Sequence, residues 1–235
     1  KKMKYSDFVA KQLVQLGYTH CFFLAGGNIM HLLESMSNEM ECIPVAHENT
    51  GIIAAEYLNS LPGDSKAIAL VTAGPGITNS LTGISGANLE SRELLVIGGT
   101  VKTIDLSSEN LRQRGIQEVD GCKLVESITK HSFRLTSQKQ LGDVIAKIKD
   151  GYADRKGPVF IEIPLDVQAQ DVKDSYKYSE LELKLNVKVH SDEEFFMIER
   201  TLKNSKRPII LIGGGIKRHI AEQLSQDIEN SQLPI

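Results

Sequence analysis

The sequence predicts an α/β fold built on a six-stranded, mostly parallel sheet with helices on both faces. Short apolar runs alternate with amphipathic stretches along the first 165 residues. The apolar runs are continuous rather than alternating, which is typical of strands covered on both faces. Helix-length segments join many of the runs, and parallel strands need connections of that length.

The expected strands are the apolar runs at residues 21–24, 43–46, 67–71, 94–97, 133–135 and 158–163. Residues 8–16 form the first expected helix, ended by Gly17, and Asn28 is expected to cap the second. Further helices are expected at residues 47–58, 76–89 and 141–152. The polar stretch 102–120 interrupts this alternation, which is typical of a functional loop.

The chain is expected to contain one domain and the beginning of another. Residues 1–165 form the first domain, and the charged segment 166–189, which has no apolar period, reads as a linker. Residues 190–235 offer a helix, one strand at 209–212 and a helix at 216–228. One strand and its helices cannot bury a core. We therefore expect an incomplete, Rossmann-like central domain of a longer protein.

The amino-acid composition limits the kinds of partner that the chain could bind. The 235 residues carry a formal net charge of −3, with 24% charged and 41% hydrophobic residues. This balance argues against nucleic acid or an anionic membrane surface as partner. No stretch approaches the roughly 20 apolar residues that span a bilayer. Cys21, Cys42 and Cys122 form no CxxC pair and are expected to be reduced, buried thiols, which favours a cytoplasmic location.

Taken singly, the candidate motifs are ambiguous. The turn at residues 71–79 joins a strand to a helix, and its glycines would let a ligand approach the backbone. It is not a P-loop, because the Lys-Ser/Thr pair of that motif is absent. A purely structural turn explains the pattern equally well. The glycines at 213–215 fit a simple turn, because Arg218 stands where a dinucleotide fingerprint needs a small residue. His47-Glu48 is no zinc motif, because Gly51 replaces the second histidine, and Glu48 also suits a helix start.

The order of several segments is more specific than any one of them. These segments are 22–27, 47–48 with 54–57, 71–79 with 81–84, 95–99, 117–120, 129–132, 157–168 and 207–215. In this order and spacing they resemble the N-terminal pyrimidine-binding domain, and the first strand of the central domain, of thiamine-diphosphate-dependent enzymes of the acetolactate synthase-like family.

The resemblance implies roles for particular residues. Glu48 matches the glutamate that hydrogen-bonds N1′ of the aminopyrimidine and favours the imino tautomer, whose nitrogen removes the C2 proton. Gln117 matches a glutamine on the substrate side of the cofactor, and these two are the catalytic candidates. His47 is expected to serve in packing or hydrogen bonding. The residues expected to bind the cofactor are Gly26, Glu48, Thr72, Pro75, Gly76 and Asn79.

The resemblance also implies an activity and an assembly. The enzyme would decarboxylate a 2-keto acid such as pyruvate and ligate the product to an acceptor, as a homodimer or homotetramer with the site near the interface. The family holds Mg²⁺ and the diphosphate through a Gly-Asp-Gly motif. No such motif occurs here. We therefore expect no metal ligands in this chain, a diphosphate-binding domain outside it, and no activity from it alone. FAD as a second cofactor is left open.

Two alternatives are kept. Phe23, Ala25 and Ile116 depart from the residues usual in acetolactate synthases, and the run 23–32 is similar to a branch of the family in sugar and polysaccharide pathways. The first alternative is therefore a thiamine-diphosphate-dependent two-carbon transferase. The second is a Rossmann-type nucleotide-binding module that uses the turn at Gly74 or at Gly213.

Overall fold

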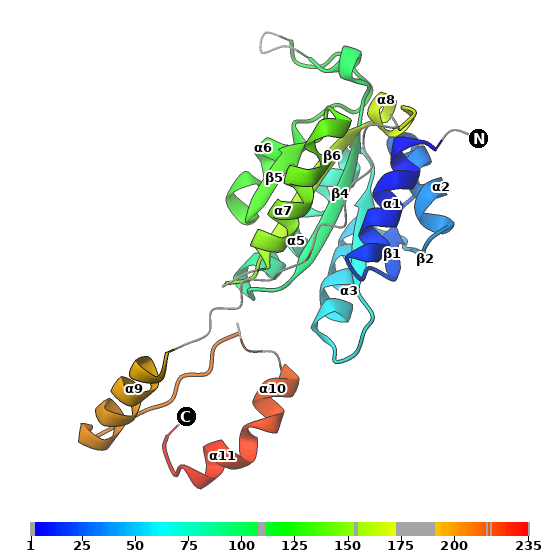
Figure 1. The fold of residues 1–235 in the computed structure, drawn as a ribbon. Helices are drawn as coiled ribbons and strands as arrows, with labels where there is room; N and C mark the ends of the chain where they lie inside the picture. Colours follow the sequence, from blue (N-terminus) through cyan, green and yellow to red (C-terminus); the bar gives the residue numbers. More distant parts are fainter. Residues whose placement is uncertain are drawn as a thin grey trace. The chain divides into compact units, whose positions relative to one another are not determined.

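A computed structural model describes residues 3–107, 111–152, 155–172, 191–214, 216 and 218–234. The chain divides into two compact units, one ending at Leu181 and the other beginning at Glu182. The first contains a six-stranded sheet in the order β2-β1-β3-β4-β6-β5 (Figure 1). Every neighbouring pair is parallel. The strands are β1 (His20–Phe23), β2 (Glu41–Pro44), β3 (Ala67–Val71), β4 (Leu94–Thr100), β5 (His131–Arg134) and β6 (Pro158–Pro164).

Helices cover both faces of this sheet, and each face has its own apolar core. Successive strand residues point to opposite faces, so Ile68 belongs to one core and Ala69 to the other. One core is closed by α1 (Tyr5–Gln15), α2 (Met30–Ser37) and α7 (Leu141–Gly151). The other is closed by α3 (Glu48–Ser60), α5 (Leu81–Leu89) and α6 (Gly121–Val125). The predicted fold class is confirmed.

The strand order creates a reversal point between β1 and β3. The chain leaves β1 through α2 to the edge strand β2, then returns through α3 on the other face to β3. The turns that follow β1 and β3 therefore start side by side and diverge. In open α/β sheets, ligands bind at this point, outside the carboxyl ends of the strands.

The first unit continues past β6 into a short helix, α8 (Leu165–Gln168). An antiparallel bridge joins Lys4 to Asp171, and the Tyr5 N–H donates to the Gln170 carbonyl at 2.7 Å. Val167 is fully buried. Residues 166–172 of the segment predicted to be a linker thus pack on the first unit. The rest of that segment, 173–189, lies outside the described residues.

Several predicted element boundaries differ from the observed ones, and three of these differences have a clear physical cause. The helix predicted at 76–89 is two helices, α4 (Pro75–Thr78) and α5, because the Ser80 hydroxyl donates to the Gly76 carbonyl at 2.7 Å and such back-bonding bends a helix. Asn28 does not cap α2: it lies in a 3₁₀ turn, η1 (Gly27–Ile29), and no side-chain hydrogen bond caps α2. β2 begins two residues early, because Glu41 pairs with His20 of β1.

The described residues of the second unit form helices only. These are α9 (Asp192–Asn204), α10 (Arg218–Gln223) and α11 (Ser225–Asn230). A capping box starts α9, in which Ser191 and Glu194 bond each other's backbone N–H at 3.3 and 3.0 Å. The strand predicted at 209–212 does not form: a strand needs a ladder of partners, and the Ile210 N–H reaches only the Pro234 carbonyl among the described residues. The helix predicted at 216–228 is divided into α10 and α11.

Candidate functional site

The turns after β1 and β3 touch at the reversal point of the sheet. A β-carbon built on Gly26, which follows β1, would lie 2.4 Å from the Thr72 Cβ, which follows β3. Real β-carbons never approach so closely, so the Gly26 backbone rests directly on the Thr72 side chain. The position of Gly26 therefore requires glycine, and the two turns form one continuous surface.

Glu48 lies beside this surface as the first residue of α3. His47 caps the helix, its Nδ1 accepting from the Asn49 N–H at 3.2 Å, so the predicted hydrogen-bonding role of His47 is confirmed. The helix macrodipole favours a carboxylate at this position. Glu48 is only 5% exposed, and its Oε2 accepts from Asn79 Nδ2 at 2.9 Å. Its Oε1 faces the Gly76 backbone, 3.7 Å from an ideal β-carbon there.

The turn between β3 and α4 wraps around Thr72. Gly74 has φ +63° and ψ −116°, a conformation that only glycine adopts readily. Pro75 follows at the first helical position, where a missing N–H costs nothing, and it is exposed. A β-carbon on Gly76 would lie 3.0 Å from Thr72 Cγ2. The Gly26 and Gly76 backbones thus pack closely against the Thr72 side chain, with no side chain of their own between.

Gln117 reaches the same turn through its backbone. It is exposed, and its φ of +56° is rare for a residue with a side chain. A β-carbon on Gly74 would lie 2.6 Å from the Gln117 carbonyl oxygen. The structure therefore brings the predicted site residues into one connected group, in which Gln117 is joined through Gly74. These residues are Gly26, Glu48, Thr72, Pro75, Gly76, Asn79 and Gln117.

Glu118 was not predicted as a site residue, although it organises the loop behind Gln117. Its Oε1 accepts from the Ser107 N–H at 2.6 Å and the Ser107 hydroxyl at 2.8 Å. Its Oε2 accepts from the N–H groups of Arg114 and Gly115 at 2.9 and 3.0 Å. Burial alone would raise the pKa of Glu118, but these hydrogen bonds outweigh it and lower the pKa to about 2.

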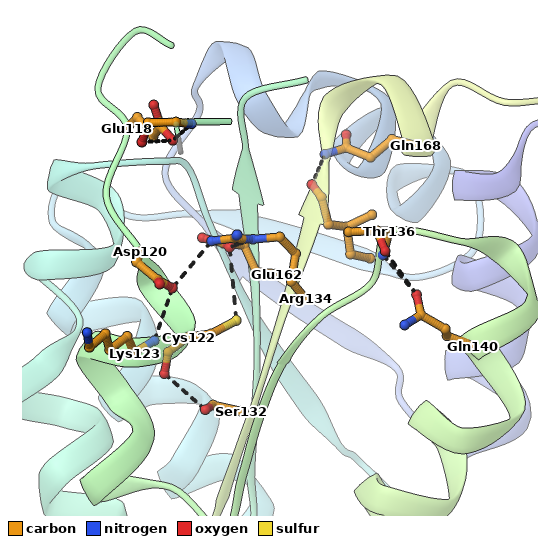
Figure 2. Close-up of polar contacts among 12 residues, drawn as sticks. Glu118, Asp120, Cys122, Lys123, Ser132, Arg134, Thr136, Gln140, Glu162 and Gln168 are labelled. Carbon is orange, nitrogen blue, oxygen red and sulfur yellow. Dashed lines mark hydrogen bonds and ion pairs between the residues drawn. The ribbon is translucent and has the colours of Figure 1, made fainter. Parts of the chain in front are cut away.

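A buried ion pair lies under the end of the same loop (Figure 2). Arg134 on β5 pairs with the fully buried Glu162 of β6, and its Nη2 lies 3.3 Å from Asp120 Oδ1. Burial raises the pKa of Glu162, and Arg134 offsets this only in part. Burial and the Glu162 charge raise the pKa of Cys122 to about 12, which leaves a neutral thiol. Asp120 also accepts from the Lys123 N–H at 3.2 Å and so starts α6.

Two residues of α8 hold other loops of the site. Asp166 accepts from the Thr103 N–H at 2.8 Å and from the Thr103 hydroxyl at 2.5 Å. Gln168, fully buried, donates from Nε2 to the Asn28 carbonyl at 2.8 Å, which fixes the turn that carries Gly26. Asp166 and Gln168 are polar residues that come soon after a buried strand, and this position is the sequence signal for residues that hold neighbouring loops.

The arrangement suits a ligand that carries a basic nitrogen. Glu48 is a buried carboxylate with one oxygen held by Asn79 and the other facing a glycine, so it can share a proton with such a nitrogen. Gly26 and Gly76 allow the two turns to close around Thr72 beside this carboxylate. Within the part of the chain that the structure describes, no cluster of three or more His, Cys, Asp and Glu side chains is suited to a metal ion. Nor is any described helix long and apolar enough to cross a membrane.

Comparison with known proteins shows which family has this fold and this site. Residues 3–124 match the family described as "Thiamine pyrophosphate enzyme, N-terminal TPP binding domain". The chain belongs to this family.

Acetolactate synthases of several organisms match along nearly the whole chain. The acetolactate synthase large subunit of Haemophilus influenzae is 30% identical, covering 100% of this chain and 41% of that protein. The large subunit of Buchnera aphidicola subsp. Acyrthosiphon pisum is 28% identical, covering 98% and 40%. Acetolactate synthase 2, chloroplastic, of Nicotiana tabacum is 27% identical, covering 99% and 35%. The chain thus spans about two fifths of the length of these relatives.

Proposed function

We propose that this chain is the pyrimidine-binding part of a thiamine-diphosphate-dependent enzyme that decarboxylates a 2-keto acid such as pyruvate and ligates the product to an acceptor. The observation that carries the proposal is Glu48, buried at the reversal point of the sheet and held by Asn79 at 2.9 Å. The relatives support this activity over a sugar-pathway transferase or a Rossmann-type nucleotide-binding module.

Thiamine diphosphate, when bound, would supply an acidic carbon, which is nucleophilic towards the keto group once deprotonated, and an electron sink for decarboxylation. Glu48 would hold the pyrimidine ring through Oε1 and keep a proton at that atom for a ring nitrogen. Asn79, by occupying Oε2, fixes the rotation of the carboxyl group, so that a single oxygen faces the ring. Such prealignment removes reorganisation from the proton-transfer step.

The glycines and Gln117 would complete the site. Gly26, Gly76 and Thr72 form the surface on which the pyrimidine ring would lie, and Pro75 fixes the start of α4 beside it. Gln117, at the exposed end of its loop, would donate a hydrogen bond to the 2-keto acid from the side of Gly74. A side-chain amide can orient a carboxylate or a carbonyl without changing its own protonation state.

Further features of the intact enzyme are part of the proposal. Mg²⁺ and the cofactor diphosphate would be held by a domain that this chain does not contain, and FAD is an optional second cofactor. The site would lie at the interface of a homodimer or homotetramer, because Asn79 and Gln117 are exposed beside the buried Glu48. The three free cysteines support a reducing compartment, the cytoplasm.

Product analysis of the intact protein tests the proposal. The protein, thiamine diphosphate and Mg²⁺ are incubated with pyruvate, or separately with a ketose phosphate and an aldose phosphate acceptor. Release of CO₂ from pyruvate together with a five-carbon 2-hydroxy-3-keto acid is expected. Turnover of the ketose phosphate alone would show a two-carbon transferase, and turnover of neither substrate would contradict the proposal.

A further inference from the structure

The Glu118 carboxylate ties together described residues from both ends of the loop that carries Gln117. Glu118 uses both oxygens: Oε1 binds Ser107, and Oε2 binds the backbone N–H groups of Arg114 and Gly115. The partners lie 11, 4 and 3 residues before Glu118. The carboxylate therefore fastens the beginning of the loop to its end, through three backbone N–H groups and the Ser107 hydroxyl.

Gln117 needs such support because its backbone is strained. A left-handed φ of +56° persists in a residue with a side chain only where neighbouring contacts hold it. On one side the Gln117 carbonyl rests against Gly74. On the other side Glu118 follows directly, and Asp120 is fixed two residues further on by Arg134. Gln117 thus lies between two anchored points of the loop.

We propose that Glu118 is a positioning residue, whose carboxylate holds the Gln117 backbone in the left-handed conformation and so sets the position from which Gln117 meets the substrate. The inference rests on the proposed function, since it requires that Gln117 acts on the 2-keto acid. Glu118 itself would contact neither the substrate nor the cofactor. Its effect on catalysis should therefore pass through Gln117 alone.

The first test uses the protein without cofactor. In Glu118→Gln one carboxylate oxygen becomes an NH₂ group, which would face a backbone N–H, donor against donor. Trypsin cleavage after Arg114 should then be at least about tenfold faster than in the wild type, because the loop opens more often. Glu118→Asp keeps the charge and should fall between the two. Glu126→Gln, at an exposed residue of the following 3₁₀ turn, is the matched control and should cleave as the wild type does.

The second test uses the intact enzyme with thiamine diphosphate and Mg²⁺. Glu118→Gln should lower kcat/KM for pyruvate by roughly 10- to 100-fold, because displacing a substrate-contacting group by about 1 Å can cost about 100-fold. Hydrogen–deuterium exchange at the cofactor C2, which depends on Glu48, should stay within about twofold of the wild type. The double variant Gln117→Ala/Glu118→Gln should be no worse than Gln117→Ala, because both changes remove one interaction.

The results of these two tests decide whether Glu118 positions Gln117. Unchanged trypsin cleavage in Glu118→Gln, or losses of kcat/KM that multiply in the double variant, would overturn the positioning role while leaving the proposed function intact. Loss of C2 exchange together with turnover in Glu118→Gln would show a general structural role instead. If Gln117→Ala turns over pyruvate normally, the assigned role of Gln117 fails and takes this inference with it. Absence of C2 exchange in the wild type would refute the proposed function itself.

Discussion

Replacing Gly74 with alanine tests the geometry of the site most simply. The conformation at Gly74, φ +63° and ψ −116°, costs a residue with a β-carbon about 1–3 kcal/mol. The new β-carbon would also lie 2.6 Å from the Gln117 carbonyl oxygen, a backbone atom that cannot rotate away. Overpacking of this kind costs about 1–3 kcal/mol. Gly74→Ala should therefore lower the free energy of unfolding by about 2–6 kcal/mol.

Urea unfolding followed by circular dichroism measures this loss, since the chain has no tryptophan. In a thermal scan the same variant should melt at least about 4 °C lower. Gly86→Ala is the matched control: Gly86 lies on the exposed face of α5 with no heavy atom within 4 Å of an ideal β-carbon. That variant should gain about 0.5–1 kcal/mol from helix propensity. Equal stability of Gly74→Ala and the wild type would refute the described turn.

Three further predictions concern the ion pair, the loop and the cofactor. Arg134→Leu should cost about 3 kcal/mol by leaving Glu162 buried without its partner, and Glu162→Met in the same chain should recover most of it. Because the pKa of Glu162 is raised, the loss in Arg134→Leu should grow as pH rises from 5 to 8; urea unfolding at both values checks this. The lowered pKa of Glu118 stabilises the fold above about pH 4.5, and this contribution is lost as pH falls towards about 2. Glu118→Gln should therefore be less stable than the wild type at pH 6, and the difference should become much smaller at pH 2.5. Finally, the 235 residues alone should bind thiamine diphosphate with a Kd no tighter than roughly 1 mM, since a few neutral hydrogen bonds contribute about 1 kcal/mol each. Calorimetry in the presence of Mg²⁺ measures this affinity, and micromolar binding would contradict the prediction.

The strands were predictable because each is an apolar run bounded by polar residues or glycine. Sequence periodicity could not give their order, because the insertion of β6 between β4 and β5 depends on which faces the connecting helices cover. The break between α4 and α5 was missed because Ser80 and Asn79 are both acceptable in helices. Only the hydrogen bonds to Gly76 and to Glu48 show why the helix stops there.

At the site, the glycines and Glu48 could be selected as candidates from the sequence because a motif places each after a strand. The residues that hold them were missed, since their partners are distant in sequence. Gln168 meets Asn28 across 140 positions, and Arg134 meets Glu162 across 28. One signal was available: Glu162 is a lone charge within an apolar strand, and a buried charge requires a partner.

Exchange of the cofactor C2 proton in Glu48→Gln tests the central claim most directly. The intact protein is loaded with thiamine diphosphate and Mg²⁺, and deuterium uptake at C2 is followed after rapid acid quenching. Glutamine keeps the size of the side chain and its contact with Asn79, so cofactor affinity should change less than about tenfold. Exchange should slow by at least about 100-fold, because the proton on the carboxyl is lost. Exchange at the wild-type rate in a fully loaded variant would remove Glu48 from the mechanism.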